Sequence, residues 1–188
     1  LLGLPGVLLL SLAACAGEPI AGSAGCLVPT QGYLARLRKI CDTHGILVVF
    51  DEVITGFGRT GAPFAAQSFG VTPDMMTMAK ALTNAAQPMG AVAISERIYD
   101  TVMAAAQEGA IEFFHGYTYS GHPAACAAGL ATLDIYRDEG LFERAHELAP
   151  YFQDAMFSLR CTPPIPGIPR YVRPPAFDLQ PNPAHGWS

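Results

Sequence analysis

The stretch ILVVFDE, residues 46–52, joins five consecutive apolar residues, three of them β-branched, to two carboxylates. A short apolar run without alternation is typical of a parallel strand that is buried on both faces. The preceding residues, 30–45, carry apolar side chains at the spacing of an amphipathic helix, with Thr30 as the expected N-cap and Gly45 as the expected C′ residue. A helix followed directly by a buried strand is half of an α/β repeat.

The alternation of strands and helices continues along the chain. Short apolar stretches at 75–79 and 91–94 predict two more strands, and Ser95 is suited to cap a helix that runs through residue 103. Two further helices are expected over 122–138 and from residue 141 to 159, where Pro150 would kink or restart the second one. The predicted fold class is therefore α/β, a mostly parallel sheet flanked by helices.

Composition narrows the class of protein. The chain has 188 residues, about one domain by length, and 51% of them are hydrophobic, which excludes a disordered polypeptide. The net charge of −5 gives none of the positive potential that nucleic-acid binding needs. Only 14% of the residues are charged, so we expect part of the surface to be buried against something else.

The two ends differ from the middle. Residues 1–17 are uncharged but lack a starting Met and a basic segment, which favours a disturbed buried strand over a signal peptide or a membrane span. A lipid anchor on Cys15 is the alternative for this segment. Residues 161–188 hold eight of the 16 prolines and predict an irregular tail. The five cysteines form no C-x-x-C pair, as is usual for reduced thiols in a cytoplasmic protein.

Two residues mark the candidate site. Asp51 follows the apolar run directly, and Lys80 is the only charged residue between Asp74 and Glu96. Asp51 is either a strand-end cap or a ligand to a cationic group, and Lys80 is either an amine that reaches water or a nucleophile among apolar neighbours. Carboxyl ends of parallel strands share one sheet edge, where ligands bind. A carboxylate and a lone amine at that edge are what pyridoxal 5′-phosphate requires, whereas the histidines show no metal-ligand spacing.

Three longer motifs carry a family resemblance. They are FDEVITGFGRTG at 50–61, MAKALTN with PMGAV at 78–92, and FFHGYTYSGHP at 113–123. Together they resemble the class III pyridoxal-phosphate-dependent aminotransferases, and the last motif is most similar to the ω-amino acid–pyruvate (β-alanine–pyruvate) branch. The resemblance covers residues 18–159 and implies part of the large cofactor-binding domain of a fold-type I transferase, with 18–160 as that domain.

The resemblance also implies roles for individual residues. Lys80 would form the Schiff base with the cofactor and move the substrate proton, Asp51 would pair with the pyridinium nitrogen, and Val53 would pack on the ring. Thr118 would donate to the phosphate in a neighbouring subunit, which implies a homodimer or a dimer of dimers. Glu18 would lie near the pocket for the substrate carboxylate. The implied reaction moves an amino group from an ω-amino acid or amine to pyruvate, with no nucleic acid, membrane or metal involved.

Departures from the family pattern give further expectations. The family has glycine where Ala85 stands, so we expect a strained backbone with positive φ there. The phosphate-cradling loop before Glu18 and the carboxylate-binding arginine after residue 159 are not recognisable. We therefore expect a fragment whose residues 161–188 are a frame-shifted remnant of the small domain. The alternative function is a catalytically silent module that serves only in structure or dimerisation.

Overall fold

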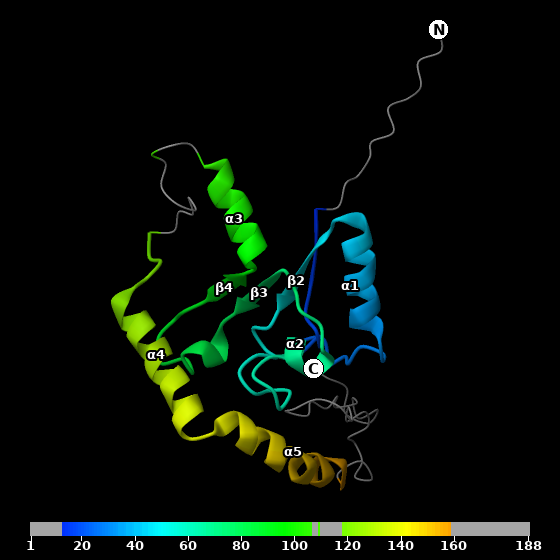
Figure 1. The fold of residues 1–188 in the computed structure, drawn as a ribbon. Helices are drawn as coiled ribbons and strands as arrows, with labels where there is room; N and C mark the ends of the chain where they lie inside the picture. The colour runs from blue at the N-terminus through cyan, green and yellow to red at the C-terminus, as the bar shows by residue number, and fades with distance from the viewer. Residues whose placement is uncertain (1–12, 107–108, 110–117, 159–188) are drawn as a thin grey trace, which may run out of the picture.

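The computed structural model describes residues 13–106, 109 and 118–158 (Figure 1). Their centre is one four-stranded sheet in the order β1-β2-β3-β4. The first three strands run parallel, and the fourth is antiparallel to the third. The prediction of an α/β fold with a mostly parallel sheet is therefore confirmed. The strands are β1 (Ala14–Gly17), β2 (Leu47–Asp51), β3 (Met75–Met78) and β4 (Ala91–Ile94).

Helices flank this sheet on both sides. In Figure 1 the sheet lies between α1 on one side and α4 on the other, and α5 continues from the end of α4. A single 3₁₀ turn, η1, follows β3 directly. The helical elements are α1 (Tyr33–His44), α2 (Ala65–Phe69), η1 (Lys80–Leu82), α3 (Glu96–Ala105), α4 (Pro123–Asp138) and α5 (Leu141–Phe157).

One face of the sheet packs into the main core. Val48 and Phe50 of β2 are buried against Leu34 and Cys41 of α1. The alternate residues of β2, which point to the other face, are only half-buried. The prediction that this strand is buried on both faces is therefore wrong for the described part of the chain, where α1 and α2 supply the core on one side.

The described chain starts close to a strand, as the interpretation of residues 1–17 predicts, but residues 14–17 are half-buried or exposed, so the predicted burial is wrong for this part. Ala14–Gly17 pairs in parallel with β2, and Cys15 packs partly buried against the core of α1. Residues 1–12 lie outside the described residues. None of the helices in the described ranges combines the length and the apolarity that crossing a bilayer requires.

The helix ends confirm some predicted caps and correct others. Gly45 ends α1 in the left-handed conformation with φ of 65°, as predicted. Thr30 is not the N-cap, because α1 begins only at Tyr33 and Gly32 occupies that position. Ser95 does precede α3, but its hydroxyl caps nothing and is buried without a partner among the described residues. Pro150 lies inside a single helix, α5, so it does not restart it.

Asp74, the residue before β3, connects three other elements at the amino edge of the sheet. Its carboxylate accepts hydrogen bonds from the Val48 N–H at 2.8 Å, from Arg38 of α1 at 2.6 Å and from Arg97 of α3 at 2.8 Å. Burial alone would raise the pKa of Asp74, but these three donors outweigh it and hold that pKa below its ordinary value. Asp74 therefore stabilises the sheet at the edge opposite to the candidate site.

Candidate active site

Three of the predicted site residues lie at the carboxyl edge of the parallel strands. Glu18 follows β1 directly, Asp51 is the last residue of β2, and Lys80 opens η1 just after β3. The expectation that Asp51 and Lys80 follow neighbouring parallel strands is confirmed by this topology. The edge therefore brings two carboxylates and one amine to one side of the sheet.

Asp51 is held by a short local contact. Its Oδ1 accepts a hydrogen bond from the Val53 N–H at 3.0 Å, and its backbone pairs in register with Thr77. Among the described residues, this is the hydrogen bond that the Asp51 carboxylate accepts. The other oxygen, Oδ2, is therefore left for a ligand. The geometry thus accommodates both interpretations of Asp51, the strand-end cap and the partner of a cationic group.

Lys80 is exposed, although its sequence neighbours are apolar. Of the two interpretations of Lys80, this exposure agrees with an amine that reaches water, and the role of Lys80 as a nucleophile stays a prediction. Its backbone has a φ of 45°, in the left-handed region that non-glycine residues rarely adopt. Asn84 and Ala85 share this feature, with φ of 49° and 62°. The predicted positive φ at Ala85 is confirmed, and strain of this kind gathers at functional sites.

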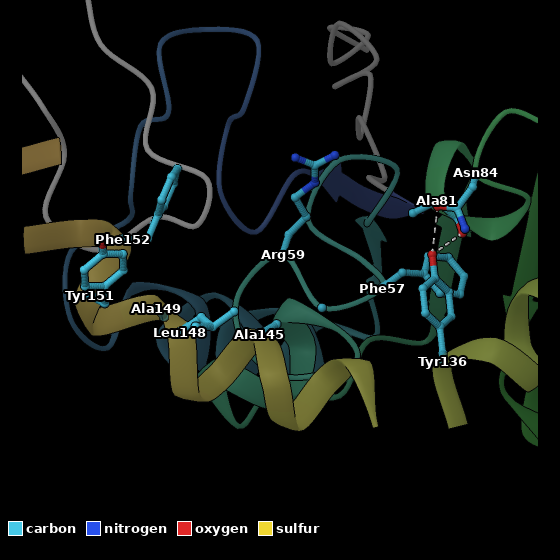
Figure 2. A pocket seen from close by; sticks show the side chains of 11 residues that line it. Phe57, Arg59, Ala81, Asn84, Tyr136, Ala145, Leu148, Ala149, Tyr151 and Phe152 are labelled. Carbon is cyan, nitrogen blue, oxygen red and sulfur yellow. Dashed lines mark hydrogen bonds between the residues drawn. The ribbon is translucent and has the colours of Figure 1, made fainter. Parts of the chain in front are cut away.

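Tyr136 of α4 reaches the turn that carries Lys80 (Figure 2). Its hydroxyl lies 2.7 Å from the backbone carbonyl of Ala81, to which it donates, and 3.2 Å from the side-chain oxygen of Asn84. The ring stacks on Phe57 with centroids 5.9 Å apart, and Phe57 belongs to the loop after Asp51. Burial raises the pKa of the Tyr136 hydroxyl, so this group remains a donor near neutral pH.

Glu52 is the buried carboxylate that the sequence analysis did not single out. It is fully buried and accepts hydrogen bonds from the Thr55 hydroxyl at 2.5 Å and from the N–H groups of Ala65 at 3.0 Å and Ala66 at 2.7 Å. These contacts attach the first turn of α2 to the end of β2. Successive side chains along a strand point to opposite faces, so Glu52 points away from Asp51. This alternation is the sequence signal that could have distinguished the buried carboxylate from the one at the site.

The loop between Glu52 and α2 depends on a close backbone approach. The Gly56 N–H donates to the Glu52 carbonyl at 2.8 Å, and a Cβ at Gly56 would lie 2.7 Å from that same oxygen. Only glycine fits this position without a shift of the backbone. Gly56 is therefore the position at which this loop needs a glycine.

Glu18 and Thr118 differ in how they are held. Glu18 Oε2 accepts the Gly22 N–H at 2.9 Å, so its carboxylate closes the turn after β1. Thr118 is exposed in the turn that precedes α4 and is not part of the sheet edge. The first five residues of the third motif, 113–117, lie outside the described residues.

Two cavities flank these elements. One of about 620 Å³ lies between the loop after β2, the turn after β3 and α5, and Figure 2 shows Phe57, Asn84 and Tyr136 along it. A second of about 710 Å³ lies beside the start of α1. Neither is lined by Asp51 or Lys80. Over the ranges that the structure describes, no three His, Cys, Asp or Glu side chains are grouped to hold a metal ion.

Comparison with known families decides the descent of the chain. The model of the family "Aminotransferase class-III" matches residues 10–168. The chain belongs to the class III aminotransferases. Members of this family are transaminases that use pyridoxal 5′-phosphate, so the resemblance of the three motifs is confirmed at the level of the family.

Two curated aminotransferases are similar in sequence to most of this chain. An omega-aminotransferase of Caulobacter vibrioides is 58% identical over 173 residues, which cover 92% of this chain and 39% of that protein. A beta-alanine–pyruvate aminotransferase of Pseudomonas aeruginosa is 58% identical over 151 residues, covering 80% of this chain and 34% of the relative. The chain therefore spans less than two fifths of the length of these relatives.

Solved structures give the same fold. An (S)-enantioselective omega-transaminase from Thermomicrobium roseum matches with a TM-score of 0.76 and 42% identity, over 84% of this chain and 34% of that one. A transaminase from a marine Virgibacillus matches with a TM-score of 0.80 and 38% identity, over 92% and 38% of the two chains. The sheet and helices described above are thus part of the fold of pyridoxal-phosphate transaminases.

Proposed function

We propose that this chain is the cofactor-binding part of a transaminase that moves an amino group from an ω-amino acid or amine to pyruvate. The observation that carries the proposal is the delivery of Asp51 and Lys80 by neighbouring parallel strands to one sheet edge. The choice of donor and acceptor rests on 58% identity to an omega-aminotransferase and a beta-alanine–pyruvate aminotransferase.

The residues at this edge fit pyridoxal phosphate by their chemistry. Asp51 has one oxygen occupied by the Val53 N–H, so the other would keep the pyridinium nitrogen protonated. The exposed amine of Lys80 would hold the cofactor covalently and then move the substrate proton. When bound, the cofactor supplies an electron sink for charge that develops on the substrate.

The other predicted residues complete this arrangement. Val53 would pack on the cofactor ring, and Glu18 would lie near the substrate carboxylate. Thr118, exposed before α4, would serve the phosphate site of a neighbouring subunit, so the proposed active unit is a homodimer or a dimer of dimers. Residues 18–160 are the proposed part of the large domain, and the proposed location is the cytoplasm.

A second candidate function is a silent structural module. It is favoured by apolar side chains that stay at the surface, among them Leu130 at 64% and Tyr151 at 76% exposure. Clusters of such residues mark surface that normally meets another domain or subunit. A chain that keeps the sheet but lacks its partners would bind the cofactor weakly or not at all.

An assay of amino transfer separates the two candidates. The purified chain, with excess pyridoxal phosphate, is given β-alanine and pyruvate, and alanine formation is measured beside size-exclusion chromatography. A dimer that forms alanine, with loss of that activity in Lys80→Arg, supports the transaminase. Aggregation or a defined oligomer without turnover supports the silent module.

A further inference from the structure

We propose that Tyr136 is a positioning residue, which fixes the direction of the Lys80 side chain by holding the turn that carries it. The inference rests on the proposed role of Lys80 as the lysine that binds the cofactor. It concerns α4, an element that starts more than forty residues after Lys80 in the sequence.

The turn after β3 needs support from outside itself. Lys80 has a left-handed backbone with φ of 45°, and its carbonyl accepts a long bond of 3.4 Å from the Thr83 N–H. A non-glycine residue keeps such a conformation when surrounding contacts determine it. The next carbonyl along, that of Ala81, receives the Tyr136 hydroxyl at 2.7 Å. This bond fixes the peptide between Ala81 and Leu82, one residue beyond Lys80, so it holds the turn from which the Lys80 side chain leaves.

Tyr136 is itself held rigidly. It is 8% exposed, and its ring lies between Phe57, at a centroid distance of 5.9 Å, and Phe142 of α5, at 5.2 Å. Phe57 also meets Phe64 edge to face at 5.3 Å. The ring therefore contacts the loop that follows Asp51, while the hydroxyl contacts the turn of Lys80. One side chain thus relates the two segments that would hold the cofactor.

A purely structural role is the competing explanation, and it predicts a different pattern. In that case every variant that destabilises the aromatic cluster would change the reactivity of the Lys80 amine to the same extent. If Tyr136 positions the turn, loss of its hydroxyl alone changes the reactivity of the Lys80 amine, whereas loss of a neighbouring ring contact leaves that reactivity unchanged.

Because the chain has few lysines, the reactivity of Lys80 can be measured directly. The chain has two lysines, Lys80 and Lys39 of α1, so peptide mass spectrometry after pyridoxal phosphate and borohydride gives the labelling of Lys80 relative to Lys39. The urea-denatured chain gives the ratio of Lys80 to Lys39 labelling expected when no folded structure favours either lysine. Tyr136→Phe removes the hydroxyl and keeps the ring, Phe142→Leu removes a ring contact and keeps the hydroxyl, and Tyr33→Phe is the exposed control. Urea unfolding of each variant records its stability.

We expect the native chain to label Lys80 preferentially. Tyr136→Phe should lower the ratio of Lys80 to Lys39 labelling about fivefold, which is the effect of one typical hydrogen bond. Phe142→Leu should keep this ratio, even where it is as unstable as Tyr136→Phe or less stable. An unchanged ratio in folded Tyr136→Phe overturns the inference alone, as does an equal fall in Phe142→Leu. A native ratio no higher than that of denatured chain overturns the proposed function itself. If Tyr136→Phe does not fold, Asn84→Ala, which leaves the Ala81 bond, must keep the ratio for the inference to stand.

Discussion

Asp51 pairs in register with Thr77, three residues before Lys80, so adjacent parallel strands end in a carboxylate and in the turn that bears an amine. This relationship is set by the hydrogen bonds of the sheet rather than by side-chain packing. Any chain that keeps β2 and β3 in this register delivers both groups to one edge. The consequences for cofactor binding and for stability can be measured separately.

Asp51→Asn tests the role of the carboxylate. The amide oxygen can still accept the Val53 N–H, so we expect a change in the free energy of unfolding below about 1 kcal/mol. The variant loses the negative charge that would keep the pyridinium nitrogen protonated, and we expect pyridoxal phosphate binding to weaken at least about tenfold. An absorbance titration of the lysine-bound cofactor measures this, with exposed Asp100→Asn as control. Equal binding by both variants would contradict the role of Asp51.

Glu52→Ala tests the anchor of the loop. The change leaves two backbone N–H groups and the Thr55 hydroxyl without their buried acceptor. We expect a loss of about 3 kcal/mol of stability in urea unfolding, since an unsatisfied buried donor costs about 1–3 kcal/mol. Glu52→Gln, which keeps one oxygen, should lose less. If Glu52→Ala is no less stable than the exposed Glu147→Ala, the contacts of Glu52 do not hold the loop.

Ala85→Gly tests the strain in the turn after β3. Because Ala85 has φ of 62°, glycine at this position should stabilise the chain by about 1 kcal/mol. Ala86, the next residue, does not have positive φ, and Ala86→Gly should give no gain. Urea unfolding of both variants makes the comparison. A gain at residue 86, or none at residue 85, would show that backbone conformation is not the cause.

Asp74 predicts a specific dependence of stability on pH. Since folding lowers the pKa of Asp74, its contribution is complete above the ordinary carboxyl value of 3.8 and is lost as the pH falls through the folded pKa. The difference in unfolding free energy between the native chain and Asp74→Asn should therefore be constant from about pH 5 to 8 and shrink below that range. A difference that grows in acid would have the wrong sign for a lowered pKa.

The sheet was predictable from the sequence because its strands are local signals. Apolar runs located β2, β3 and β4 within a residue or two of their observed bounds. The antiparallel direction of β4 was not predicted. It follows from the link between β3 and β4, which contains only η1 and therefore lacks the helix that a parallel crossover normally uses.

The features that were missed depend on partners distant in sequence. The five residues of α2 have no periodicity to reveal them, and their first N–H groups are capped by Glu52, 13 and 14 residues earlier. Tyr136 was expected only as part of a helix, because its acceptor Ala81 lies 55 residues away. The exposure of Lys80 was also not decided by its apolar neighbours, since a turn can direct a side chain away from them.

The central claim is that Lys80 is the lysine that binds the cofactor, and the most direct test is to locate the cofactor after borohydride reduction. The folded native chain is incubated with pyridoxal phosphate, reduced, digested and mapped by mass spectrometry, alongside Lys80→Arg and Lys39→Arg. The account predicts label on Lys80 in the native chain and in Lys39→Arg, with loss of the visible absorption band only in Lys80→Arg. Label divided evenly between Lys80 and Lys39, or a band that persists in Lys80→Arg, would contradict it.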